Sequence, residues 1–283
     1  MQSSEKKFID VEQVIASKNK NLLRFMPGFL LSYIKRIVHQ EEINAFISKH
    51  GDKTSFAFVD AIITEFKVNV EYEGLDNVPS DNGCIIASNH PLGGLDAMAL
   101  IQVISKKRKD LKFIVNDILL QLKNLETLFI GVNKHGKNSA EVFATMDQLY
   151  ASATAILIFP AGLVSRKQDK GEIKDLDWKK SFVTKARKNQ SSIIPVYIEG
   201  RNSNFFYTFA RARSRLGIKA NIEMFYLMDE MYHQKNKTIK IIFGEALQPT
   251  AFNESKTDYE WAQIVKDHVY TLGRGGKSPI AFY

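Results

Sequence analysis

A histidine and an aspartate lie close together in one short stretch of this chain, where they could carry out proton-transfer chemistry. The apolar run at residues 84–87 is followed by His90, the Gly93-Gly94 pair and Asp96. This pattern predicts a strand, a tight loop and the start of a helix. Histidine titrates close to neutral pH, which suits a general base, and a neighbouring carboxylate can hold its ring. We therefore take His90 as the candidate base and Asp96 as its partner.

Both residues also have a plainer interpretation. A single histidine near a strand end is more often structural than catalytic, and Asp96 could instead cap a helix that begins at Ala97. Three further motifs decide the matter, because they follow in a recognisable order at residues 129–134, 159–166 and 193–196.

In this order the four motifs resemble those of the glycerolipid acyltransferase family, whose members acylate lysophosphatidate and related lysolipids. The family blocks are Asn-His-x4-Asp, Gly-x-hydrophobic-hydrophobic-x-Arg, Phe-Pro-Glu-Gly and Ile-Pro-Val, and the match spans roughly residues 70–245. The resemblance implies that His90 removes a proton from an acceptor hydroxyl, which attacks the thioester of an acyl donor. It also implies that Asp96 orients the imidazole and stabilises its charged form.

The chain departs from the family pattern at three places. Five residues, not four, separate His90 from Asp96, and the two glycines between them could absorb the extra residue. Lys134 stands in place of arginine, which keeps the charge but loses the bidentate fork. Ala161 replaces the glutamate that in the family helps to shape the acceptor site. The Phe-Pro-Ala-Gly variant resembles a bacterial branch linked to O-acylation of lyso-aminolipids, such as N-acylated ornithine or glycine.

The motifs also supply candidate substrate-binding residues. Arg166 and Lys134 could hold a phosphate or carboxylate of the acceptor, whereas Lys137 and Lys167 are interpreted as solvated charge. Backbone N–H groups around Gly162 could stabilise a developing oxyanion, or the segment could be a plain turn after a buried strand. The complete expected set is Asn89, Gly131, Lys134, Phe159, Pro160, Ala161, Gly162, Ser165 and Arg166.

Composition excludes several other kinds of site. The single cysteine, Cys84, allows no internal disulfide and is interpreted as a small core residue in a reducing compartment. The six histidines show no ligand spacing, so we expect no metal site. The net charge of +8 favours acidic partners, among them anionic lipid headgroups and acyl carrier protein. Only the charge would support a nucleic-acid-binding function, and we expect no nucleic-acid partner.

Two stretches combine aromatic side chains with cations, as segments that lie on a membrane surface do. They span residues 22–38 and 204–215, and core packing of their aromatic rings is the alternative. No run reaches the roughly 18 apolar residues of a membrane span, and the N-terminus lacks the apolar core of a secretory signal. We therefore expect a peripheral protein on the cytoplasmic face of a membrane. The expected membrane contacts are Phe25, Phe29, Phe205, Phe206 and Arg211.

The remaining pattern predicts an α/β fold with a mostly parallel central sheet flanked by helices. Residues 1–66 read as an N-terminal helical segment that forms a membrane-facing platform, packed on or continuous with an acyltransferase domain at 67–283. Strands are expected near 67–72, 84–88, 112–116, 128–132, 155–159, 193–198, 220–228 and 238–243. Helices are expected near 96–108, 116–125, 138–152, 178–188 and 255–271.

Together these features predict an acyltransferase that moves a fatty acyl chain from a thioester to a hydroxyl of a lyso-lipid, most simply an N-acyl amino-acid lipid. Acyl carrier protein or coenzyme A would carry the acyl chain as a co-substrate, with no bound cofactor. Two alternatives stay open. One is a lysophosphatidate or other lysophospholipid acyltransferase, and the other is a non-catalytic lipid-binding protein on the same fold.

Overall fold

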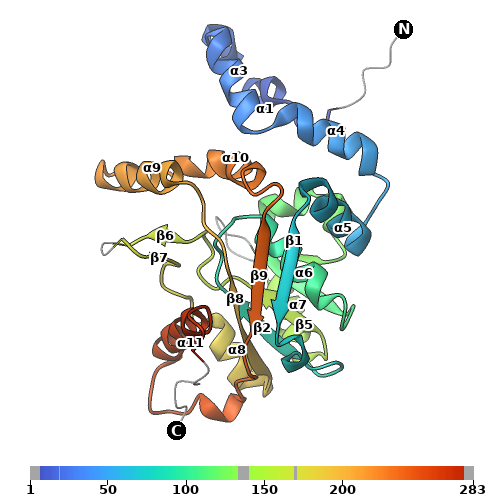
Figure 1. Cartoon of the computed structure of the whole chain (residues 1–283), viewed down its shortest axis with the longest axis vertical. Coiled ribbons are helices and arrows are strands. Elements are labelled where there is room, and N and C mark those ends of the chain that lie inside the picture. The colour runs from blue at the N-terminus through green and yellow to red at the C-terminus, as the bar shows by residue number, and fades with distance from the viewer. Residues whose placement is uncertain (1–6, 19, 133–139, 169–170, 277–283) are drawn as a thin grey trace.

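A seven-stranded sheet forms the centre of the molecule in the computed structural model, which describes residues 7–18, 20–132, 140–168 and 171–276 (Figure 1). The strand order across the sheet is β1-β9-β8-β2-β5-β3-β4. The strands are β1 (Asn69–Glu73), β2 (Cys84–Ser88), β3 (Leu111–Asn116), β4 (Phe129–Val132), β5 (Ala155–Ile158), β8 (Ser192–Ile198) and β9 (Thr238–Phe243). A separate antiparallel pair joins β6 (Arg166–Lys167) to β7 (Ile173–Lys174).

Neighbouring strands of the central sheet run parallel, except that β9 is antiparallel to β8. The central strand β2 is buried along its whole length. Cys84 and Ile86 enter the larger hydrophobic core on one face, whereas Ile85 and Ala87 enter the core on the other. A strand covered on both faces has a nearly continuous apolar sequence, and the run at residues 84–87 has this pattern. The predicted fold class is confirmed.

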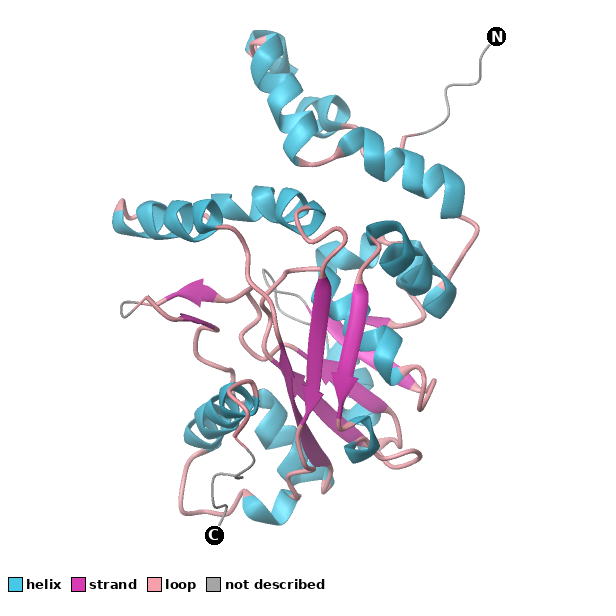
Figure 2. Ribbon diagram, viewed as in Figure 1, coloured by secondary structure: helices cyan, strands magenta, loops and turns pink. Residues whose placement is uncertain are grey.

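Helices cover both faces of the sheet (Figure 2). On one face α5 (Ser55–Phe66) packs against α6 (Leu95–Ile104), and α6 contacts β1 and β9. On the other face lie α7 (Ala140–Ala151), α8 (Ser181–Asn189) and α11 (Asp258–Leu272). The last of these begins at a capping box in which Thr257 and Glu260 exchange hydrogen bonds with each other's backbone. Both helix layers bury their apolar faces against the sheet. The carboxyl end of β2, where the first motif begins, is therefore packed on both faces.

The N-terminal helices extend above the sheet and contact the segment between β8 and β9 (Figure 1). They are α1 (Val11–Lys18), α2 (Lys20–Phe25), α3 (Gly28–Ile37) and α4 (Gln40–His50). The opposing segment contains α9 (Asn204–Arg215), the 3-10 helix η4 (Ile222–Tyr226) and α10 (Leu227–Tyr232). The hydroxyl groups of Tyr33 and Tyr226 lie 2.8 Å apart, and His39 Nε2 lies 3.0 Å from Asp229 Oδ1. The His39 ring also stacks on Tyr232 at 3.8 Å.

The structure differs from the local predictions in three places. Residues 220–228 form η4 and the start of α10, not a strand. Residues 116–125 form two 3-10 helices, Asp117–Gln121 and Lys123–Leu125. The helix α9 and the pair β6–β7 were not among the predicted elements. A short apolar run does not distinguish a strand from a buried helical turn, and here Glu223 inside the run makes buried ion pairs that fix the helical form.

Candidate active site

His90 and Asp96 are in direct contact at the end of β2. His90 Nδ1 lies 3.0 Å from Asp96 Oδ2, and the carboxylate is fully buried. The same carboxylate accepts hydrogen bonds from the backbone N–H groups of Leu92 and Ala97, each at 2.8 Å. Gly93 adopts a φ of 91°, a left-handed conformation that favours glycine, and so accommodates the extra residue. The alternative that Asp96 caps a helix beginning at Ala97 is wrong, because α6 already begins at Leu95.

The imidazole of His90 is also fixed in orientation by an aromatic side chain of the third motif. Phe159 stacks on it with ring centroids 4.1 Å apart and planes 17° apart, and Phe113 packs edge-on against Phe159. With Nδ1 facing the carboxylate, Nε2 is the nitrogen left to accept a proton. A histidine held in this way can serve as a general base, with Asp96 stabilising the imidazolium that forms.

Buried hydrogen bonds hold the backbone around His90. The Asn89 side chain donates to the carbonyl of Ile198 at 2.9 Å and accepts from its N–H at 2.7 Å. Asp175 accepts from the His90 N–H at 3.3 Å, from Ser165 Oγ at 2.6 Å and from the Trp178 indole. Burial raises the pKa of Asp175, whereas the hydrogen bonds from Ser165 and Trp178 act to lower it. Asn89 and Ser165, predicted to bind substrate, therefore support the loop instead.

The third motif turns sharply after β5. Gly162 adopts a φ of 67°, and its N–H donates to the carbonyl of Phe159 at 3.0 Å. The Gly162 N–H is therefore already bonded within the turn, and oxyanion stabilisation by the backbone N–H groups around Gly162 and Leu163 stays a prediction. Ala161 is buried in the core that contains Trp178 and does not line the large cavity described below. Phe159, Pro160 and Gly162 do line it, as predicted for substrate-binding residues.

Arg166 lies in a buried ion network and not in the cavity. Its guanidinium donates to Glu223 at 2.9 Å and to the carbonyl of Val164 at 2.9 Å, and it lies over the ring of Phe206. Arg213 pairs with the other oxygen of Glu223 at 2.9 Å. Burial lowers the pKa of Arg166, and the charge of Glu223 acts to raise it. Arg166 is thus paired with Glu223 and does not line the cavity, and its binding of the acceptor stays a prediction.

Two further predicted residues come from the second motif. Gly131 lies in β4, half buried, outside the residues that line the cavity. Lys134, like Lys137, lies outside the described residues. Cys84 behaves as predicted for a core residue, since burial raises the pKa of its thiol to about 11 and keeps it protonated.

A large, mainly apolar cavity of about 680 Å³ opens beside His90. Its walls come from the N-terminal helices, the helices α5, α6 and α10, the carboxyl ends of strands and the start of α8. Phe46, Phe58 and Ile62 are typical of its apolar surface, and the cations Lys179 and Lys185 also line it. Cavities of this size and composition suit small or lipid-like ligands. The arrangement places a proton acceptor beside space for a hydrocarbon chain.

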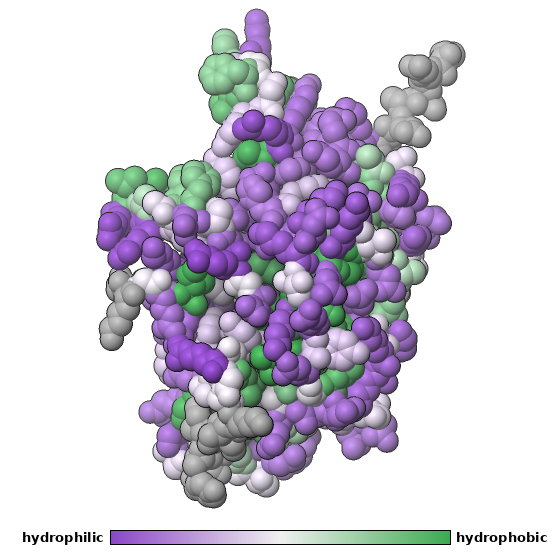
Figure 3. All heavy atoms as spheres, viewed as in Figure 1, coloured by the Kyte–Doolittle hydropathy of each residue, from purple (hydrophilic) through white to green (hydrophobic). Residues whose placement is uncertain are grey.

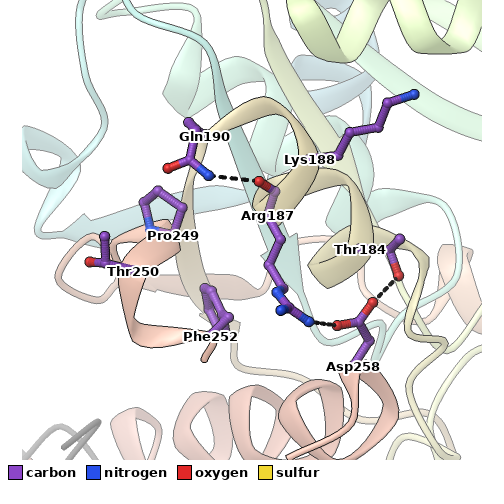
Figure 4. A pocket seen from close by; sticks show the side chains of 8 residues that line it. All are labelled: Thr184, Arg187, Lys188, Gln190, Pro249, Thr250, Phe252 and Asp258. Atoms are coloured by element: carbon purple, nitrogen blue, oxygen red, sulfur yellow. Dashed lines mark hydrogen bonds and ion pairs between the residues drawn. The ribbon is translucent and has the colours of Figure 1, made fainter. Parts of the chain in front are cut away.

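A second, open cavity of about 500 Å³ lies near the opposite edge of the sheet, at the end of α8 that precedes β8. Figure 4 shows the side chains of Arg187 and Thr184 turned toward Asp258, whereas Lys188 points away from them. Arg187 donates to Asp258 at 2.8 Å, and the Thr184 hydroxyl donates to the same carboxylate at 2.5 Å. None of the four motifs contributes to it, so we assign it no part in the chemistry.

The expected membrane contacts separate into exposed and buried residues. Phe25 and Phe29 are each 79% exposed and Phe205 is 53% exposed, whereas Phe206 is fully buried beneath Arg166. The prediction for Phe206 is therefore wrong, while Arg211 on the same helix is partly exposed. Apolar atoms gather at the tip of α3 and the outer end of α9 (Figure 3). Within the described ranges, no helix has both the length and the hydropathy needed to cross a bilayer.

Sequence reasoning missed Asp175, Trp178, Lys179 and Glu223. None of them lies in one of the four motifs, and only the fold brings them to the loop that carries His90 or to the ion network beside it. The Trp178-Lys179-Lys180 run was a visible signal, since it places an aromatic residue beside two cations at the start of the helix predicted near 178–188.

Comparisons with known proteins agree with the four motifs. The family model described as "Acyltransferase" matches residues 13–276. The chain is 42% identical over 265 residues to a "Lyso-glycine lipid O-acyltransferase" of Phocaeicola vulgatus, covering 93% of this chain and 95% of that protein. It is 40% identical to a protein of the same name from Bacteroides thetaiotaomicron, covering 93% and 97%.

A solved structure, the 1-acyl-sn-glycerophosphate (LPA) acyltransferase of Thermotoga maritima, aligns with 90% of this chain and 97% of its own. The identity is 16% and the TM-score is 0.48. The family match itself rests on the sequence model and on the two relatives, which cover nearly the whole chain. The resemblance drawn from the motifs is thereby confirmed, and the chain belongs to the acyltransferase family.

Proposed function

We propose that this enzyme transfers a fatty acyl chain from a thioester to the hydroxyl of a lyso-glycine lipid, an N-acylated glycine with a free hydroxyl on its acyl chain. The observation that carries the proposal is the His90–Asp96 pair at the mouth of a large apolar cavity. The acceptor class follows the two relatives named as lyso-glycine lipid O-acyltransferases. Ala161, where related enzymes have glutamate, is consistent with an acceptor other than lysophosphatidate.

The reaction needs a single general base. His90 Nε2 takes the proton of the acceptor hydroxyl as its oxygen attacks the thioester carbonyl. Asp96 stabilises the resulting imidazolium through Nδ1. Collapse of the tetrahedral intermediate breaks the carbon–sulfur bond, and the imidazolium returns the proton to the leaving thiolate. The products are an ester and a free thiol, so His90 ends in its starting form without a covalent enzyme intermediate.

The acyl donor is a thioester of acyl carrier protein or coenzyme A, with the acyl chain in the apolar cavity. The enzyme binds the cytoplasmic face of a membrane from one side through the exposed aromatic residues of α2, α3 and α9. Phe25, Phe29 and Phe205 are suited to this, because an interfacial segment inserts apolar side chains beside cations.

A competition assay tests the proposal. Purified enzyme receives both thioester donors with a mixture of lyso-glycine lipid, lysophosphatidate and other lysophospholipids, and mass spectrometry identifies the products. Acylated glycine lipid is the expected product. Phosphatidate as the main product would favour a lysophosphatidate acyltransferase. No product from any acceptor, with binding to lipid vesicles intact, would favour a lipid-binding protein without turnover.

A further inference from the structure

One cation in the large cavity has no partner among the residues that the structure describes. Lys179 and Lys185 both line the cavity with His90. Lys185 pairs with Asp147, and the cavity's carboxylate, Glu65, lies 3.9 Å from Lys235. The ammonium of Lys179 is exposed and has neither an ion pair nor a hydrogen bond to any residue in the described part of the chain. A single unpaired positive charge in a mainly apolar cavity is suited to an anionic ligand.

The backbone of Lys179 is attached to the loops that form the candidate active site. Its N–H donates to the carbonyl of Pro160 at 3.2 Å. The preceding residue, Trp178, is fully buried and donates to Asp175, which also accepts the N–H of His90. The position of Lys179 relative to the candidate base is therefore set by two buried connections, and its side chain alone is free to adjust to a ligand.

The ammonium of Lys179 lies over the turn of the third motif. A methyl group placed on Gly162 would lie 3.5 Å from Lys179 Nζ. The neighbouring Ala161 offers no carboxylate to this cation, and Ser181, which also lines the cavity, is neutral. An anion entering here therefore meets one ammonium without competition from an acidic side chain of the motif.

We propose that Lys179 binds the carboxylate of the acceptor headgroup and so selects carboxylate-bearing acceptors. This inference rests on the proposed function, because it names the residue that recognises the glycine end of a lyso-glycine lipid. The ammonium forms a charge-assisted hydrogen bond to the carboxylate while the acyl hydroxyl reaches His90 Nε2. Lysine supplies a compact point charge with three rotatable donors, which can bind a carboxylate without the fixed geometry of the arginine fork.

Two acceptors and three variants test the assignment. The acceptors are an N-(hydroxyacyl)glycine and its glycinamide, which differ only in the headgroup charge. The variants are Lys179→Met, Lys179→Arg and the control Lys180→Met, whose exposed side chain does not line the cavity. Calorimetric binding and acceptor KM are measured for each, with donor KM recorded in parallel.

Wild type and Lys180→Met are expected to bind the carboxylate acceptor about tenfold more tightly than the glycinamide. Lys179→Met should lose this preference, and Lys179→Arg should regain part of it. Equal preference in wild type and Lys179→Met, or a rise in donor KM alone, would overturn the assignment. Because binding is measured without turnover, a carboxylate preference lost in Lys179→Met supports the inference even if no acyl transfer occurs. Absence of turnover counts only against the proposed function.

Discussion

The motif residues fall into two groups, one lining the large cavity and the other bonded outside it. His90, Phe159 and Gly162 line the large cavity, whereas Asn89, Ser165 and Arg166 make buried hydrogen bonds away from it. Residues of both groups come from the same motifs, and most are polar in type. A motif of this kind therefore contains both residues that can contact a substrate and residues that hold those residues in position. The first group should govern turnover and the second group stability.

The largest effect is expected on the cavity side. His90→Ala removes the candidate base, so kcat should fall about 100- to 10,000-fold while the thermal midpoint stays close to that of wild type. Asp96→Asn removes the charge that stabilises the imidazolium and should give an intermediate kcat. His233→Ala is the control, since His233 is exposed directly after α10 and lies outside the cavity. Full activity in His90→Ala would break the comparison.

On the buried side the expected change is in stability. Glu223→Gln leaves Arg166 and Arg213 without their counter-charge and should lower the free energy of unfolding by about 3–5 kcal/mol. Arg166→Met should lower the free energy of unfolding by less, because Glu223 still forms its ion pair with Arg213. Urea unfolding measures the change, and Glu172→Gln, at an exposed ion pair, should stay within about 1 kcal/mol of wild type. A rise in acceptor KM without loss of stability in Arg166→Met would return Arg166 to the substrate-binding group.

The same distinction applies to the aromatic residues of α9. Phe205→Ser should keep the fold and weaken binding to anionic vesicles about tenfold, since an exposed ring can insert into the interface. Phe206→Ser should instead destabilise the protein, because Phe206 is fully buried. Phe29→Ser on α3 is expected to behave like Phe205→Ser. Vesicle sedimentation and thermal unfolding measured on the same samples separate the two effects, and unchanged sedimentation of Phe205→Ser would contradict the membrane proposal.

The smallest effect concerns a second histidine, in a buried position on α11. Burial lowers the pKa of His268 below its ordinary 6.5. The folded state therefore favours the neutral ring, so its contribution is complete above pH 6.5 and is lost as the pH falls toward the folded-state pKa. The slope is at most about 1.4 kcal/mol per pH unit for one proton. The free energy of unfolding is measured between about pH 7.5 and 5.5, roughly one unit either side of the ordinary histidine pKa. Its slope against pH should be shallower in His268→Leu than in wild type.

Much of the fold could be predicted because its strands are short apolar runs separated by clear helical patterns. β2 is buried along its whole length and β8 over most of it, so each sequence is apolar except for a serine at one end. Residues 220–228 could not be assigned correctly, since Glu223 looks like a solvated charge until Arg166 and Arg213 are placed beside it. Arg166 is 57 residues from Glu223 in the sequence, and packing brings the charges of all three residues together.

The sequence alone determined the family, the position of the candidate base and its partner, and the mostly parallel sheet, because these depend on residue types at short, fixed spacings. The tertiary structure alone decided which motif residues reach the cavity. Asn89, Ser165 and Arg166 are buried and bonded outside the cavity. Asp175 and Lys179, which lie outside the motifs, are brought to the loops around His90. The physical reason is that burial and charge pairing depend on every neighbour in space, whereas a motif records only neighbours along the chain.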